Sequence, residues 1–167
     1  MQRLFEKIDQ NASNSKEQET IFKIFNDAEQ TYKVEPDKDM CTMFLRTEAL
    51  KKENGNFTRA REILDEMQDK EFYPTIEDYN AVLNLLVHAT DFTPNQLKQE
   101  LRHFEGGITG AHEFLDEETV DILSIGYHKA QDIVGLRRVL QFAEYSEWPV
   151  ASTISERFDD LRVQLLL

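Results

Sequence analysis

Four histidines and a short acidic run are the side chains that could support metal or acid–base chemistry. The histidines are spread along the chain, at His88, His103, His112 and His128. None belongs to an HExxH pattern, in which two histidines one helical turn apart bind zinc. The pair His112-Glu113 is at most half of a metal site. The run Asp116-Glu117-Glu118 lacks the alternating ligands of an EF-hand loop, and carboxylates there suit the positive end of a helix dipole. We therefore predict no metal site.

The glycine-rich segment and the single cysteine offer no catalytic pattern either. Residues 106–110 (Gly-Gly-Ile-Thr-Gly) lack the Lys-Ser/Thr of a P-loop, and the chain contains no G-x-S-x-G motif. We predict that Gly106-Gly107 ends a helix and that residues 105–114 form an irregular connection. Cys41 is alone, which excludes an internal disulfide, and a buried structural thiol is the favoured interpretation. We expect no catalytic residue, no cofactor and no enzyme activity.

The charge balance bears on the kind of partner. The chain has 32 Asp and Glu against 19 Lys and Arg, a net charge of -13. Nucleic-acid affinity depends largely on Lys and Arg that neutralise phosphates, so an acidic chain must gather its cations on one face to bind RNA. The notable basic groupings are Arg137-Arg138 and the set Arg46, Lys51 and Lys52. The charge therefore favours a protein partner, such as a basic helix or tail, and disfavours RNA.

The sequence predicts that helices carry the candidate functional residues. Gly (6) and Pro (4) are scarce, which favours long helices. Residues 37–75 form the clearest unit, because Met40 and Phe44 have helical spacing before Gly55, and Ala60 and Leu64 have it afterwards. Pro74 closes this unit. No apolar run approaches the ~20 residues of a membrane span.

The prolines indicate a repeat. Pro36 and Pro74 lie 38 residues apart, and Pro149 follows after nearly two such periods. We predict one helical-repeat domain, in which stacked hairpins bury apolar faces that each leaves uncovered alone. Its parts are a partial N-terminal repeat (1–36), the best unit (37–75), a second repeat with a long connection (76–115), a third repeat (116–150) and a C-terminal helix (151–167). This last helix either caps the stack or inserts into a neighbour through its final leucines.

Two segments resemble the pentatricopeptide repeat family, whose units are about 35 residues long. Residues 55–75 resemble the second helix and exit loop of such a repeat, and residues 78–83 (Asp-Tyr-Asn-Ala-Val-Leu) resemble the start of the next. The resemblance implies an all-α fold, a right-handed α-solenoid of antiparallel helical hairpins with about three and a half repeats. Tetratricopeptide-like arrays share this periodicity and remain an alternative.

The resemblance also implies candidate RNA-reading residues. Many proteins of this family bind single-stranded RNA, one base per repeat, through a polar residue early in the first helix and the last residue of the repeat. These positions hold Thr42 with Thr75, Asn80 with Asp116, and Asp121 with Val150. Asn with Asp suits uridine in this family, whereas the other pairs are unusual. An organellar adaptor that binds single-stranded RNA is therefore the alternative function.

The favoured function is docking onto other proteins. Four aromatic residues near helix ends and exit loops are candidate protein contacts, or else pack between repeats: Phe72, Tyr73, Tyr145 and Trp148. Relatives of this family that do not bind RNA serve as accessory subunits of mitoribosomes, ATP synthase or cytochrome c oxidase. We predict a non-catalytic, protein-binding structural subunit of such an assembly, on the matrix side of the mitochondrion. No presequence is evident at the start of the chain.

Overall fold

The structure is a computed structural model that describes residues 35–51, 54–110 and 115–166, together with Thr20, Lys23, Ile24 and Asp27. These residues contain seven α-helices and no strand, which confirms the all-α prediction. The predicted N-terminal partial repeat, residues 1–36, lies almost entirely outside the described residues, as do His112 and Glu113. None of the described helices is long and apolar enough to cross a membrane.

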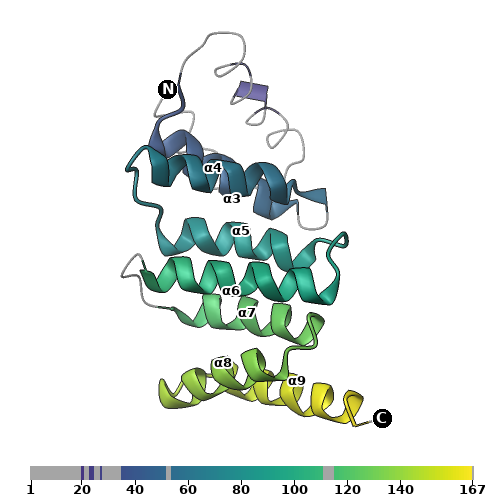
Figure 1. Cartoon of the computed structure of the whole chain (residues 1–167). Coiled ribbons are helices and arrows are strands. Elements are labelled where there is room, and N and C mark those ends of the chain that lie inside the picture. The colour runs from purple at the N-terminus through teal and green to yellow at the C-terminus, as the bar shows by residue number, and fades with distance from the viewer. Residues whose placement is uncertain are drawn as a thin grey trace.

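The helices form a stack that runs from α3 and α4 at one end to α9 at the other (Figure 1). One layer, here the A layer, contains α3 (Lys38–Leu50), α5 (Ile76–His88), α7 (Glu117–Lys129) and α9 (Val150–Gln164). The B layer contains α4 (Phe57–Asp69), α6 (Pro94–Gly110) and α8 (Ile133–Tyr145). Each A helix packs on the next, and each B helix packs against two successive A helices. This arrangement is a helical-repeat solenoid.

Side-chain caps begin several of the helices. Asp37, Asn56, Thr75 and Asp116 precede α3, α4, α5 and α7, and each accepts a hydrogen bond from a backbone amide of the first turn. Such caps satisfy amides that have no partner within the helix. Thr93 and Gln96 do the same reciprocally at the start of α6.

The B helices α4 and α8 and the A helix α7 end in one common way. After each helix comes a residue with a left-handed backbone conformation: Glu71 after α4 (φ 58), Gln131 after α7 (φ 53) and Glu147 after α8 (φ 56). The amide of the following residue donates back to a carbonyl in the last helical turn, as Asp132 does to Tyr127 at 2.9 Å. These are Schellman ends, usually made with glycine. The chain uses Glu or Gln there instead.

The prediction that α6 ends at Gly106-Gly107 is wrong, because the helix continues to Gly110. Its buried stripe, Leu97, Leu101, Phe104 and Ile108, extends past the two glycines, and Ile108 is fully buried. Burying Ile108 outweighs the low helix propensity of glycine, about 1 kcal/mol per residue. Residues 105–110, which were expected to belong to an irregular connection, are therefore part of α6.

Two glycines allow close approach of helices, Gly126 between α7 and α6 and Gly135 between α8 and α7. A Cβ on Gly126 of α7 would lie 2.6 Å from the side chain of Leu101, and one on Gly135 of α8 would lie 2.5 Å from the Tyr127 ring. Both distances are far below van der Waals contact. Any larger residue at Gly135 must therefore displace a buried aromatic ring.

Cys41 is 2% exposed in the core, which confirms the interpretation as a buried structural thiol. Burial, followed by the nearby carboxylate of Glu66, raises the pKa of this thiol to about 11. The nucleophilic form is the thiolate, so the raised pKa and the burial both disfavour reaction of Cys41 at neutral pH.

Candidate functional site

Asn80 and Asp116, the pair expected to read a base, meet where α5 passes the N-terminus of α7. The Asn80 amide nitrogen donates to Asp116 Oδ1 at 3.3 Å, and the Thr119 hydroxyl lies 2.7 Å from Asn80 Oδ1 and 2.6 Å from Asp116 Oδ1. Asp116 Oδ1 also accepts from the Thr119 amide at 2.7 Å, as the cap of α7. Asn80 is 3% exposed and Thr119 is fully buried. Both code residues are therefore hydrogen-bonded within the protein, Asn80 in a buried position and Asp116 in a half-buried one.

Thr42 and Thr75, the pair expected in the preceding repeat, are not brought together in this way. Thr75 caps α5: its hydroxyl accepts from the Asp78 amide at 3.3 Å, and the Asp78 carboxylate accepts from the Thr75 amide at 2.9 Å. Thr42 lies half-buried on α3. In the part of the chain that the structure describes, no hydrogen bond joins Thr42 to Thr75.

The third pair, Asp121 and Val150, also has protein partners. Asp121 accepts from Arg157 of α9 at 2.5 Å, and the Val150 amide donates to Glu117 at 3.1 Å. Along the A layer, polar groups of one helix thus bind polar groups of the next. Asn80, Asp116 and Asp121 are thus already bonded within the protein.

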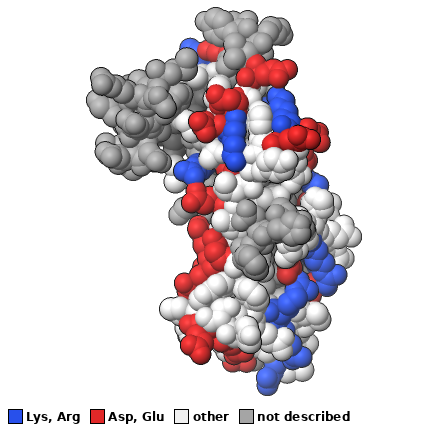
Figure 2. Space-filling view, turned by 90° about the vertical axis from the view of Figure 1, so that its left-hand side faces the viewer, with Lys and Arg blue, Asp and Glu red and all other residues white. Residues whose placement is uncertain are grey.

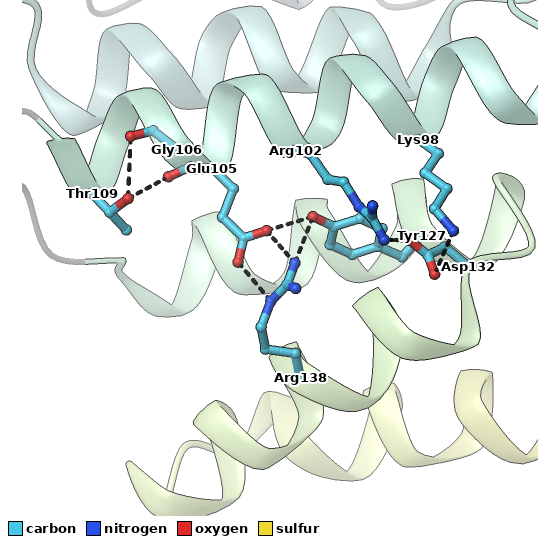
Figure 3. A network of polar contacts seen from close by, with 8 residues as sticks. All are labelled: Lys98, Arg102, Glu105, Gly106, Thr109, Tyr127, Asp132 and Arg138. Carbon is cyan, nitrogen blue, oxygen red and sulfur yellow. Dashed lines mark hydrogen bonds and ion pairs between the residues drawn. The ribbon is translucent and has the colours of Figure 1, made fainter.

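A second polar cluster joins α6, α7 and α8 on the B side of the stack (Figure 3). The Tyr127 hydroxyl donates to Glu105 Oε2 at 2.5 Å, and Arg138 donates to both oxygens of Glu105, at 3.0 and 2.5 Å. The Arg138 guanidinium also lies 5.7 Å from the centre of the Tyr127 ring. Burial, followed by the hydrogen bond to Glu105, raises the pKa of Tyr127 well above its usual range. Tyr127 is thus a neutral hydrogen-bond donor that holds Glu105 in place.

Asp132 completes this cluster at the start of α8. Lys98 and Arg102 of α6 each lie 3.1 Å from its carboxylate. Burial alone would raise the pKa of Asp132, but the hydrogen bond from Lys98 and the charges of Lys98 and Arg102 hold that pKa below its usual range. The carboxylate is charged at neutral pH and ties α6 to α8.

Within this cluster the cations face outward and the carboxylates face inward. The side chains of Arg138, Arg102 and Lys98 are 48%, 49% and 33% exposed, whereas those of Glu105 and Asp132 are 16% and 2% exposed. Figure 2 shows the corresponding segregation of charge, with basic side chains along one side of the lower half and acidic ones along the other. The predicted basic grouping Arg137-Arg138 therefore lies on the B helix α8, not on the A helices that carry Thr42 and Asn80.

The four aromatic residues predicted as protein contacts divide into two kinds. Tyr73 and Tyr145 are 75% and 90% exposed, whereas Phe72 and Trp148 pack against the core. Trp148 meets the ring of Phe142 edge-on, with ring centres 5.4 Å apart. The sequence interpretation missed Phe142 and Val134, which are also exposed, at 37% and 63%. No local sequence signal marked them, because the packing of α8 against α7 and α9 decides which of its apolar side chains are covered.

The described residues contain no group of three or more His, Cys, Asp or Glu side chains that could hold a metal ion. His128 is instead bound to Asp160 of α9, with Nε2 2.8 Å from the carboxylate. The two layers present hydrogen-bonding side chains and exposed aromatic rings. Such groups are suited to binding another molecule.

Comparison with known proteins agrees with this architecture. Residues 23–89 match the family model of the pentatricopeptide repeat domain, which spans the best predicted unit and the helix α5 after it. No curated protein and no solved structure matches the chain. Proteins with this repeat are generally non-catalytic, bind RNA or protein and are typically organellar. The resemblance seen in the sequence is thereby confirmed: the chain has a helical-repeat fold, and its residues 23–89 match the pentatricopeptide repeat domain.

Proposed function

We propose that this chain is a non-catalytic, protein-binding subunit of a larger mitochondrial assembly, such as a respiratory complex, the ATP synthase or the mitoribosome. The observation that carries the proposal is the burial of Asn80 in a hydrogen-bonded set with Asp116 and Thr119. Reading a base would require these bonds to break and a buried amide to turn outward, at a cost of about 1–3 kcal/mol for each group left unpaired. A repeat specialised for RNA would keep these groups accessible.

The distribution of charge also supports a protein partner. Exposed carboxylates gather in the first turns of the A helices, at Asp39, Glu77, Glu117 and Glu118. Two arginines of the A layer are paired with carboxylates of a neighbouring A helix: Arg46 with Glu77, and Arg157 with Asp121. Such an edge repels phosphate and attracts a basic helix or tail of a neighbouring subunit.

Co-migration tests this function. The tagged full-length chain, expressed in its source organism, is expected in the mitochondrial fraction and in a fast-sedimenting assembly on a density gradient, cross-linked to protein subunits. A chain that sediments as a free monomer, or that is found outside mitochondria, would overturn the proposal.

The second candidate function is binding of single-stranded RNA, favoured by one observation: Asn80 and Asp116 lie side by side at the positions that the family uses for base reading. Fluorescence anisotropy with a pool of random single-stranded RNA, at low and at physiological salt, separates the two functions. Under the first proposal no binding is expected even at low salt, where phosphate attraction is strongest. Sequence-selective binding whose base preference changes in Asn80→Thr, but not in the B-layer control Gln141→Ala, would favour RNA reading instead.

A further inference from the structure

The outward face of α8 carries an apolar ridge, defined here as Val134, Arg138, Phe142 and Tyr145. These residues recur at helical spacing, so they share one side of the helix. Val134 is 63% exposed, Phe142 is 37% exposed and Tyr145 is 90% exposed. Trp148 lies beside the ridge, against Phe142. Tyr, Trp and Arg are the residue types that most often dominate the energy of protein interfaces.

The same positions on the other B helices are polar or small. Counted from the corresponding core residues Ala60, Leu97 and Leu136, the positions of Val134, Phe142 and Tyr145 hold Thr58, Glu66 and Asp69 on α4. On α6 they hold Asn95, His103 and Gly106. The repeat architecture therefore does not require an apolar ridge at this place. The ridge belongs to α8 alone among the three B helices.

The charges around the Arg138 half of the ridge are positive. Arg138 lies within it, Arg137 is exposed on the same helix, and Arg102 projects from α6. Their carboxylate partners, Glu105 and Asp132, lie beneath the surface. Arg138 uses Nε and one terminal nitrogen on Glu105 and Tyr127, so among the described residues the N–H groups of Nη1 have no partner and are available to a further acceptor.

This surface suits a carboxylate-bearing helix better than RNA. Arg138 and Arg102 are already neutralised locally, so they offer directed hydrogen bonds rather than a strong long-range field. Glu144 and Glu147 are exposed next to Tyr145 and would repel a phosphate backbone that followed the ridge. Apolar side chains on one face of a helix would cover Val134 and Tyr145, and carboxylates at its edge would meet the guanidinium groups.

We propose that the α8 ridge is a docking surface for an amphipathic helix of a partner protein, with an apolar stripe flanked by carboxylates. The partner's carboxylates lie over the Arg137-Arg138 half of α8, and its apolar side chains extend to Tyr145. This surface lies on the B layer and has the opposite charge to the acidic A-layer edge. It therefore stands independently of the subunit function proposed above.

A titration with designed peptides tests this surface on the full-length chain. Two helical peptides share one apolar stripe, and one carries glutamates at its flanks while the other carries lysines. Trp148 is the single tryptophan and lies at the ridge, so its fluorescence reports binding directly if the peptides contain none. The glutamate peptide is expected to bind at least ~10-fold more tightly than the lysine peptide, and to weaken as salt is raised.

The matched variants change exposed side chains only. The double variant Val134→Ser with Tyr145→Ser should lose at least ~10-fold in affinity for the glutamate peptide, because it removes the apolar anchors. The control double variant, Thr58→Ser with Asp69→Ser, alters the same positions on α4 and should bind as the unaltered chain does. Circular dichroism would verify that both variants remain folded.

Three results would overturn the proposal. They are equal affinity for the two peptides, no binding of either peptide, and unchanged binding by the Val134/Tyr145 double variant. A parallel titration with poly(U) addresses the other class of partner. Tighter binding of poly(U) than of the glutamate peptide, lost in the same double variant, would assign the ridge to RNA instead.

Discussion

The boundary between the second and third hairpins is held by two polar junctions of opposite character. On the A layer, Asn80, Asp116 and Thr119 join α5 to α7 through short neutral side chains and one capping carboxylate, largely shielded from water. On the B layer, Glu105 and Asp132 are bound by cations that remain a third to a half exposed. The first junction is therefore expected to be structural and insensitive to salt. The second can exchange partners with solvent or with another protein.

The largest expected effect comes from crowding the B-layer junction. Gly135→Ala places a methyl group against the Tyr127 ring, which is fully buried and fixed by its hydroxyl. We expect a loss of about 3 kcal/mol in the free energy of unfolding, typical of overpacking in a rigid core. Urea denaturation followed by circular dichroism measures it.

Gly106→Ala is the matched control, because a Cβ there meets nothing within 4 Å. It should keep or raise the stability, since alanine is the better helix former by about 1 kcal/mol. Equal losses in the two variants would show that close packing of α8 on Tyr127 is not what matters.

The A-layer junction should be broken by Thr119→Val. This change keeps the shape of the side chain but leaves Asn80 Oδ1 buried without its donor, which should cost about 2 kcal/mol. The cost should be the same at low and high salt and from pH 5 to pH 8. Thr58→Val, at an exposed position on α4, is the control and should be near neutral. A strong salt dependence of the Thr119 effect would contradict the contrast between the junctions.

Asp132→Asn should weaken the B-layer junction by about 1–2 kcal/mol at neutral pH, because Lys98 and Arg102 lose a charged acceptor but remain partly hydrated. The pKa of Asp132 is lower in the folded chain, so its contribution is present above the unfolded pKa of about 4 and is lost as the pH falls through the folded value. Denaturation at pH 7 and near pH 3 should show the difference between the two chains shrinking at the lower pH. A constant difference would argue that the ion pairs contribute nothing.

The smallest expected effect is a gain. Gln131 holds a left-handed conformation, φ 53, between α7 and Asp132. Gln131→Gly should stabilise the chain by about 0.5–1 kcal/mol, because glycine adopts this conformation without strain and that outweighs its greater freedom in the unfolded state. The midpoint of thermal unfolding measures this gain, and a fall in that midpoint would refute it.

The sequence predicted the helical architecture better than it predicted the polar junctions. Periodic apolar residues and caps such as Asp116 are local signals, so they located most of the helices. The low helix propensity of Gly106-Gly107 did not predict the end of α6, because the burial of Ile108 extends the helix beyond these glycines. Asn80 and Asp116 were found through the family resemblance, not through any local pattern.

Neither a local pattern nor the family resemblance predicted the cluster around Tyr127. Glu105 lies 22 residues before Tyr127 and 33 before Arg138, on three different helices. Only the packing of α8 on α7, which Gly135 permits, decides that these side chains meet. The exposure of Val134 likewise depends on which side of α8 faces α7 and α9.

The contacts that join the hairpins span about one repeat: 39 residues from Asn80 to Thr119, 33 from Glu105 to Arg138 and 36 from Asp121 to Arg157. A chain connected in this way behaves as a one-dimensional series of nearest-neighbour couplings. Folding can then begin at whichever hairpin forms first and spread in both directions, with only short loops to close at each step. A defect at the α5–α7 junction would interrupt that spread there, so native-state hydrogen exchange would reveal two cooperative blocks in place of one.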